Sequence, residues 1–246
     1  MTRRFGARIA RKVVSLSRAA GAKLMPERVP QAQLRYRMNQ LQKVEFALRR
    51  VGASFGTASS ILDFGCGTGR LTVHMAALAP QARITGCDVV AEQMARARAR
   101  VPRGRFVVNR WCPPLEFEDA AFDLIFSYSV FTHLSEANHR DWLKELTRVL
   151  RPGGVMAHSI HSPASVARMT MFSPESLPKY ALRAGPVGYH YAVDNPATPE
   201  YGETIISKDY VLDVWPRVSG LRVVEFEEGA IESYPEGCHD LVVLKK

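Results

Sequence analysis

Three glycines at alternate positions follow a short apolar segment and carry the clearest chemical signal in the chain. The segment Ile61–Phe64 is typical of a buried strand, and Gly65, Gly67 and Gly69 come directly after it. Glycine permits a tight turn and a close approach of the backbone to a ligand. A nicotinamide or flavin fingerprint needs a small residue three positions after its second glycine, where this chain has Arg70. The loop is therefore predicted to bind a ligand other than these two cofactors.

Two carboxylates next to this loop indicate what the ligand is. Asp63 stands just before the glycines, where a negative charge favours a cationic ligand over a pyrophosphate. Asp88 ends the next predicted strand, 19 residues after Gly69, and can accept hydrogen bonds from both ribose hydroxyls. Either residue alone could be a strand-end turn residue, but the two together at this spacing favour binding. A ribose with a cationic tail and no phosphate describes S-adenosylmethionine.

Strand-like and helix-like segments alternate from residue 60 onward. Short apolar runs predict parallel strands at Ile61–Phe64, Arg83–Cys87, Phe106–Asn109, Phe122–Ser127 and Val155–His161. Helical patterns lie near Arg70–Leu78, Ala91–Arg100, Ala137–Leu150 and Lys208–Val218, and two further strands are expected at Leu221–Glu227 and Asp240–Leu244. This alternation predicts an α/β, Rossmann-like doubly wound sheet with ligands at the carboxyl ends of its strands.

The distribution of charged residues and of proline and glycine divides the chain into three parts. Residues 1–50 hold 13 Lys/Arg and two acidic residues, whereas the other 196 hold 20 basic and 22 acidic ones. Residues 1–30 are predicted to be a basic N-terminal extension, with an amphipathic helix at 3–20, and residues 31–246 to form the main domain. A Pro/Gly-rich stretch within about 162–207 is expected to be a cap insertion on the substrate side.

Composition excludes several classes of protein. The hydrophobic content of 46% and charged content of 23% exclude disorder and a disulfide scaffold. No apolar run approaches the roughly 18–20 residues that a membrane span needs. The four cysteines lack paired metal-ligand spacing, so we expect free thiols, no metal and a cytoplasmic location. The membrane surface is an alternative location, reached through residues 3–20.

The sequence resembles the class I S-adenosylmethionine-dependent methyltransferases, and in particular bacterial small-molecule enzymes of this class. The resemblance rests on Ile61–Arg70, on Gly86-Cys87-Asp88, on Phe122–Ser127, on Ser129–Leu134, on Leu150–Gly154 and on the box Gln33–Arg37. It implies a seven-stranded sheet, mostly parallel, with Asp240–Leu244 as its antiparallel last strand.

The resemblance also implies roles for individual residues. The cofactor would be S-adenosylmethionine, and its binding residues would be Asp63, Gly65, Cys66, Gly67, Asp88, Val89, Asn109, Arg110, Trp111 and Ser127. Asp63 would order the loop or reach the amino group of the methionine part. Many members of the family have an acidic residue after the third strand to contact the adenine amine. This chain has Asn109 there instead, and Trp111 is expected to stack on the purine.

Methyl transfer to a hydroxyl or an amine also needs a proton acceptor. His133 follows the fourth strand on the cofactor side, and His161 ends the fifth strand. Both are candidates for the base, although a packing or capping role is an alternative for His133. His190 in the cap insertion is a further candidate for a base or a substrate contact.

Three functions remain open at this point. The first is transfer of a methyl group by in-line displacement to an oxygen or nitrogen of a small-molecule or saccharide-type acceptor, with no DNA partner expected. The second is methylation of RNA or protein, with the basic N-terminus as the docking surface. The third is a non-catalytic, membrane-associated protein that retains the fold. The sequence does not specify an oligomeric state.

Overall fold

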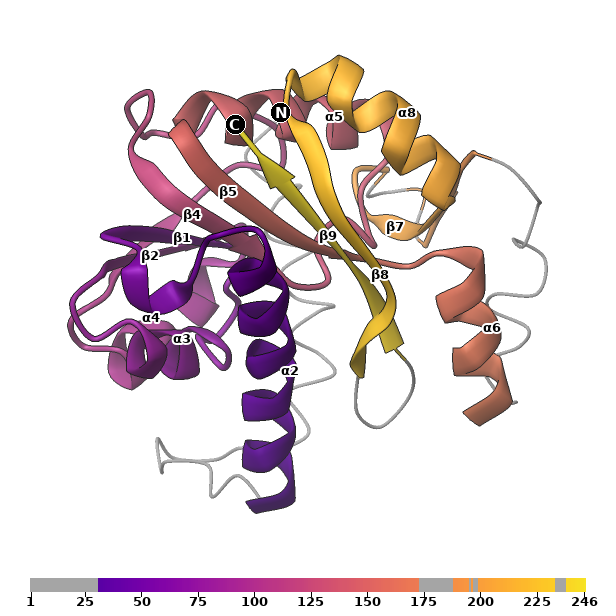
Figure 1. Ribbon diagram of the computed structural model, residues 1–246. Coiled ribbons are helices and arrows are strands. Elements are labelled where there is room, and N and C mark those ends of the chain that lie inside the picture. Colours follow the sequence, from indigo (N-terminus) through magenta and orange to yellow (C-terminus); the bar gives the residue numbers. More distant parts are fainter. Residues whose placement is uncertain (1–30, 173–187, 195, 197–198, 233–237) are drawn as a thin grey trace.

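A seven-stranded sheet forms the centre of the molecule (Figure 1). The computed structural model describes residues 31–172, 188–194, 196, 199–232 and 238–246, so the predicted basic extension lies outside the described residues. The strands of the sheet are β1 Ser60–Phe64, β2 Arg83–Asp88, β3 Arg105–Val108, β4 Phe122–Ser127, β5 Leu150–Ile160, β8 Arg222–Glu232 and β9 Cys238–Lys245. Their order is β3-β2-β1-β4-β5-β9-β8, and β9 runs antiparallel to both of its neighbours. The predicted doubly wound sheet with an antiparallel last strand is confirmed.

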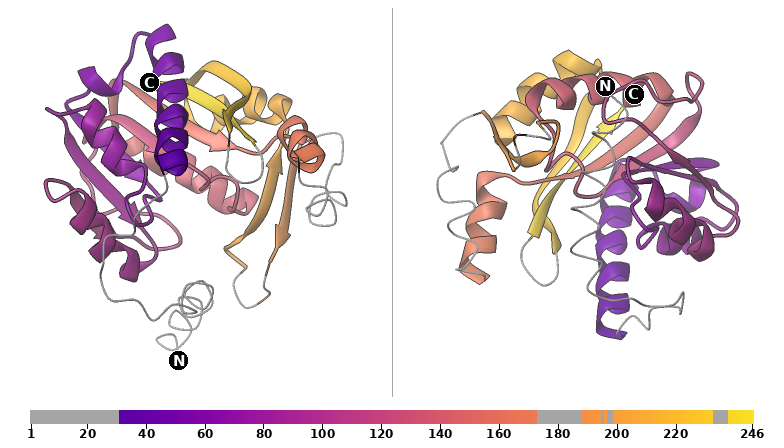
Figure 2. Two further views of the ribbon diagram at one scale, coloured as in Figure 1. Left: turned by 90° about the horizontal axis from the view of Figure 1, so that it is seen from below. Right: turned by 180° about the vertical axis from the view of Figure 1, so that it is seen from behind.

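Helices cover both faces of this sheet, which gives a three-layer arrangement (Figures 1 and 2). On one face lie α2 Gln31–Arg50, α3 Thr72–Leu78 and α4 Ala91–Arg100, together with the 3-10 turn Phe55–Thr57. On the other face lie α5 Glu136–Val149 and α8 Lys208–Ser219. Within the described part of the chain, no helix is both long and apolar enough to cross a membrane.

Successive residues of the central strands fill the two cores in turn. In β1, Ile61 packs against the helices of the first face and Leu62 against those of the second. Leu124 and Ile125 in β4 divide in the same way, and all four side chains are buried. Because side chains alternate across a strand, a strand covered on both faces must be apolar along its length. This requirement explains why continuous apolar runs predicted the strands.

Short polar residues set the ends of the helices on the second face. Ser135 precedes α5, and its hydroxyl accepts a hydrogen bond from the backbone N–H of Asn138. Ser207 caps α8 in the same way at Tyr210, 3.1 Å away. Gly220 ends α8 in a left-handed conformation, with φ of 71°.

The segment after β5 contains more regular structure than its weak periodicity indicated. It forms α6 Pro163–Phe172 and then a separate antiparallel pair, β6 Tyr189–Val193 with β7 Gly202–Ile206. The pair lies beside α6 (Figure 2), where Val166 of the helix packs on Ile205 of the strand. The described part of the predicted insertion thus contains a helix and a pair of strands.

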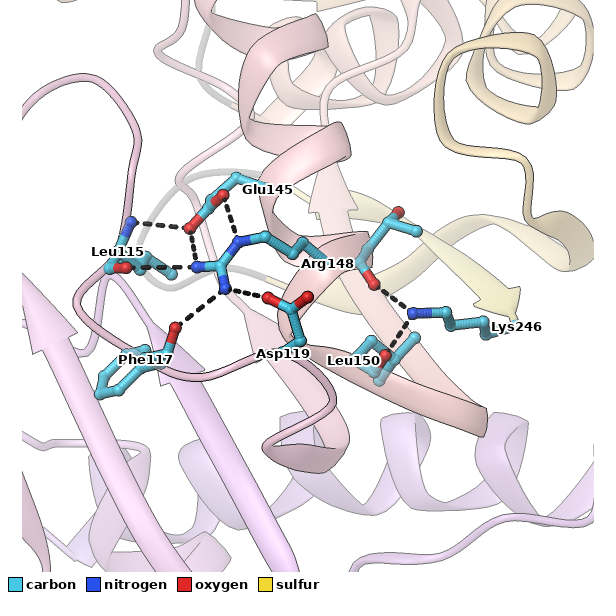
Figure 3. Close-up of polar contacts among 8 residues, drawn as sticks. Leu115, Phe117, Asp119, Glu145, Arg148, Leu150 and Lys246 are labelled. Atoms are coloured by element: carbon cyan, nitrogen blue, oxygen red, sulfur yellow. Dashed lines mark hydrogen bonds and ion pairs between the residues drawn. The ribbon is translucent and has the colours of Figure 1, made fainter.

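A guanidinium on α5 fixes the connection between β3 and β4 (Figure 3). Arg148 donates to both carboxylate oxygens of Glu145, to Asp119 and to the carbonyls of Leu115 and Phe117. Glu145 also accepts the N–H of Leu115 at 2.7 Å. Burial alone would raise the pKa of Glu145, but the hydrogen bonds from Arg148 and Leu115 outweigh it and lower that pKa. The connection that carries Trp111 is therefore attached to a rigid helix.

We expect Arg148→Gln to lower the free energy of unfolding by about 2 kcal/mol at pH 7, because it leaves the buried Glu145 carboxylate without its main donor. Urea unfolding followed by circular dichroism measures the change. Since the pKa of Glu145 is lowered by folding, the difference should disappear as the pH falls below the ordinary glutamate value of 4.5.

Arg217→Gln is the matched control for this experiment. It breaks an exposed ion pair with Asp213 in α8 and should change the stability by less than about 0.5 kcal/mol. Equal effects of the two substitutions would contradict the structural role of Arg148.

Candidate functional site

The glycine loop after β1 adopts a conformation that other residues would rarely reach. Gly65, Gly67 and Gly69 have φ angles of 76°, 53° and 75°, all in the left-handed region. The N–H groups of Gly65 and Cys66 donate to the carbonyl of Cys87 at 2.8 and 3.0 Å. A Cβ at Gly65 would lie 2.2 Å from a methyl carbon of Val130. The loop is thus folded back tightly over the end of β2.

Asp88 connects this loop to the turn after β2. One oxygen of its carboxylate accepts the N–H of Gly67 at 2.8 Å, and the other accepts the N–H of Val90 at 3.0 Å. Burial raises the pKa of Asp88, and these backbone N–H groups act in the opposite direction. Each oxygen keeps a second lone pair that can accept from a ribose hydroxyl. Val89, the next predicted contact, is half-buried in the turn between them.

Asp63 lies underneath the loop. Its side chain is 3% exposed, and one carboxylate oxygen accepts the hydroxyl of Thr72 at 2.5 Å, at the first residue of α3. Of the two roles expected for Asp63, this contact corresponds to ordering the loop. Burial raises its pKa to about 7. Burial also raises the pKa of the Cys66 and Cys87 thiols, so neither is a reactive thiolate.

The residues after β3 provide a polar atom and an aromatic ring. The N–H of Asn109 donates to the carbonyl of Asp88 at 3.0 Å, and its amide nitrogen donates to the carbonyl of Arg110. Its Oδ1 atom is buried and has no hydrogen-bond partner. Trp111 is half-buried and held by Trp142, which donates to its carbonyl at 3.2 Å. The side chain of Arg110 is exposed, so the structure does not place it with the others.

The chain turns sharply after β4. The hydroxyl of Ser127 lies 2.8 Å from Nδ1 of the buried His158, so this fully buried hydroxyl already has a partner. Ser129 has a φ of 56°, an unusual value for a residue with a side chain. Its N–H donates to the hydroxyl of Ser159 at 2.8 Å, which holds the turn against β5. This turn leads directly into the residues that carry His133.

The inserted strand β7 holds His133 in one orientation. Its Nδ1 atom lies 2.8 Å from the carbonyl oxygen of Gly202 and 3.9 Å from the buried carboxylate of Glu203. A carbonyl only accepts hydrogen bonds, so Nδ1 carries the hydrogen and Nε2 of the neutral ring is an acceptor. The ring is stacked on Tyr201, with 4.5 Å between centroids and 14° between planes.

Two further histidines lie together where β5 and β9 pair. His161 is buried, and its Nε2 atom is 3.4 Å from Nε2 of His239. Burial, and then the nearby His133, lower the pKa of His239 to about 3. His239 also faces the ring of Tyr128 at 4.7 Å. His190, the remaining candidate, lies in β6 opposite Ile205.

Sequence reasoning missed the residues that reach the site from the insertion and from the last strand. Tyr201, Gly202 and Glu203 surround His133, and His239 contacts His161. None of them belongs to a recognised motif, and their sequence distances from the predicted residues match no known pattern. Only the predicted position of the insertion, at the carboxyl edge after β5, pointed toward this region.

The fold and the glycine loop define a class I methyltransferase domain, and the comparisons with known proteins agree. Residues 61–154 match the family described as "Methyltransferase domain". A S-adenosylmethionine-dependent methyltransferase from Methanosarcina mazei has a TM-score of 0.58 at 18% identity, covering 76% of this chain and 92% of that one. A TehB-like one from Corynebacterium glutamicum has a TM-score of 0.53 at 20% identity, covering 98% of both. Residues 61–154 therefore match a methyltransferase domain, and the solved structures share the fold of the chain.

Among curated proteins, the chain is similar to trans-aconitate 2-methyltransferases. The protein from Rhodopseudomonas palustris (strain BisB18) is 35% identical over 100 residues, which are 39% of this chain and 36% of that protein. The protein from Rhizobium meliloti (strain 1021) is 31% identical over 168 residues, 65% of this chain and 61% of that one. The chain thus matches less than two thirds of the length of either relative.

The residues present fit S-adenosylmethionine, the cofactor of this family. Asp88 would hold the ribose, and the unpartnered Oδ1 of Asn109 is an acceptor suited to the adenine amine. Gly65 and Gly67, both in the left-handed region, would bring the backbone of the loop close to the methionine part. When bound, the cofactor supplies a methyl group already activated by a sulfonium.

We expect Asp88→Ala to weaken binding of S-adenosylhomocysteine by about 2–4 kcal/mol, because a carboxylate that accepts two hydrogen bonds is lost. Isothermal titration calorimetry measures the dissociation constant. Glu118→Ala, which removes an exposed acid, is the control and should bind as the wild type does. An unchanged dissociation constant in folded Asp88→Ala protein would remove Asp88 from the cofactor site.

The raised pKa of Asp63 gives a prediction for stability. Folded protein keeps the carboxyl protonated up to about pH 7, whereas the unfolded chain ionises near 3.8, so stability falls as the pH rises between these values. Asp63→Asn cannot ionise and should lose about 2 kcal/mol less than the wild type between pH 5 and pH 8. Urea unfolding at several pH values measures this, and parallel curves for the two proteins would contradict it.

Proposed function

We propose that the protein transfers a methyl group from S-adenosylmethionine to a hydroxyl or amine of a small-molecule acceptor, with His133 as the general base. The observation that carries the proposal is the orientation of the imidazole. Its Nδ1–H is held by the Gly202 carbonyl at 2.8 Å, so Nε2 presents a lone pair at the carboxyl edge of the sheet. A hydroxyl or amine must lose a proton as it is methylated, and Nε2 is placed to accept it.

The surroundings of His133 support this role. The carboxylate of Glu203, 3.9 Å from Nδ1, can attract the positive charge that the ring gains with the proton. Tyr201 and the reciprocal hydrogen bond with Gly202 prevent the ring from turning away. The hydroxyl of Ser129 lies 3.5 Å from Nε2, at the limit of a hydrogen bond, so an acceptor hydroxyl can replace it.

A base at this position also bears on the class of acceptor. The relatives carry the name of trans-aconitate, whose carboxylates are already ionised at neutral pH and need no base. A built base therefore favours an acceptor with a proton to lose, such as a saccharide-type alcohol or an amine. Functions that depend on residues 1–30, such as docking to RNA or to a membrane, stay predictions because that segment lies outside the described residues.

Formation of S-adenosylhomocysteine with a panel of acceptors tests the proposal. The panel contains polyhydroxylated saccharides, primary and secondary amines, and trans-aconitate. We expect turnover with a hydroxyl or amine acceptor, and a loss of about 10²-fold in kcat for His133→Gln at unchanged affinity for S-adenosylhomocysteine. Glu203→Gln, which keeps the shape of the side chain, should lose less, about tenfold.

Two outcomes would count against the proposal in different ways. Activity that is confined to trans-aconitate and retained in His133→Gln would contradict both the role of His133 as the base and the proposed class of acceptor. No binding of S-adenosylhomocysteine by the folded wild-type protein would remove the methyltransferase function itself.

A further inference from the structure

Tyr201 stands between two parts of the site that lie far apart in the sequence. It precedes β7, and its ring is stacked on His133 with 4.5 Å between centroids. The same ring also lies nearly perpendicular to that of Trp111, with 6.3 Å between centroids and 78° between planes. Trp111 follows β3, on the purine side, and His133 follows β4, on the acceptor side. One aromatic ring therefore connects the two sides.

The electrostatics of Tyr201 exclude proton transfer as its task. Burial raises the pKa of the phenol to about 12, and Glu203, Asp194 and Asp88 add to the effect in that order. The hydroxyl therefore stays protonated at physiological pH.

The backbone attaches Tyr201 firmly to His133. The next residue, Gly202, donates its N–H to the carbonyl of His133 at 3.0 Å. Its own carbonyl accepts a hydrogen bond from Nδ1 of the His133 ring at 2.8 Å. Thr204 donates to the carbonyl of Thr132 at 2.8 Å, so β7 pairs with the turn like an added strand. A Cβ at Gly202 would lie 2.2 Å from the carbonyl of Ala192, so only glycine fits there. A shift of the Tyr201 ring must therefore change the position of the His133 ring that is stacked on it.

We propose that Tyr201 is a positioning residue that couples cofactor binding to the alignment of His133. A cofactor seated against Trp111 restricts the Tyr201 ring, and the stacked face of that ring fixes the imidazole plane. The base is then fully aligned only when the cofactor is present. This inference rests on the proposed function for the place of the cofactor and for the role of His133.

The coupling can be measured without an acceptor. Nuclear magnetic resonance follows the titration of the His133 imidazole, assigned with His133→Gln, in protein that is free or saturated with S-adenosylhomocysteine. The titratable groups that face His133 are Glu203 on β7, Tyr201 before it and His239 on β9. We expect the midpoint of the His133 titration to differ between free and saturated wild-type protein.

Variants at position 201 separate the ring from the hydroxyl. Tyr201→Phe keeps the stack and should retain the difference in midpoint, whereas Tyr201→Leu should abolish it and weaken binding of S-adenosylhomocysteine about fivefold to tenfold. Tyr191→Leu is the matched control. It changes a tyrosine of the same insertion that bonds to the carbonyl of Pro199, and it should behave as the wild type does.

Trp111→Leu breaks the other end of the contact without altering β7. At saturating S-adenosylhomocysteine, Trp111→Leu should also reduce the difference in midpoint. This variant therefore tests the coupling even if Tyr201→Leu fails to fold. An unchanged difference in Tyr201→Leu or in Trp111→Leu overturns the coupling. A wild-type protein that binds no S-adenosylhomocysteine in the calorimeter would instead overturn the proposed function.

Discussion

Three consecutive N–H groups at the end of β1 are satisfied by the end of β2, and the cofactor side of the site depends on this arrangement. Gly65 and Cys66 donate to the carbonyl of Cys87, and Gly67 donates to the carboxylate of Asp88. A loop with three left-handed residues has few internal hydrogen bonds, so these external acceptors determine its shape. The same carboxylate holds Val90 and thereby the start of α4. Strand ends, loop and helix are thus positioned together.

The proposed acceptor side is built on a different principle. Here the parallel sheet supplies only the turn after β4, and a separate pair of strands completes the site. β7 pairs with the backbone of Thr132 and His133 as though it extended a sheet, although it belongs to an insertion some 70 residues later in the chain. The polar groups around His133 are therefore supplied by long-range contacts, while those around the cofactor come from neighbouring strand ends.

This difference explains how much the sequence could predict. Buried parallel strands must be apolar along their length, so the doubly wound sheet with its antiparallel last strand was predicted correctly. The left-handed loop after β1 requires glycine, and for this reason its three glycines stand out in the sequence. β7 is short and pairs with a turn, and Gly202-Glu203-Thr204 lacks the apolar pattern of a buried strand. His239 faces His161 only because β9 inserts beside β5, a contact that no local spacing encodes. The predicted boundaries at residue 30 and the roles of the individual site residues stay predictions.

The glycine at position 202 separates a fixed part of the proposed acceptor site from a variable part. Its backbone holds the imidazole, and the space around it admits no side chain, so that position is closed to change. Its neighbours at 201 and 203 lie two residues apart in an extended segment, and their side chains face the same side. Exchange of either side chain would therefore change what the imidazole contacts, while the backbone carbonyl that holds its Nδ1 atom would stay in place. In laboratory evolution of the proposed acceptor range, variation at positions 201 and 203 would thus alter the stacking and the charge around His133 without altering the backbone at Gly202.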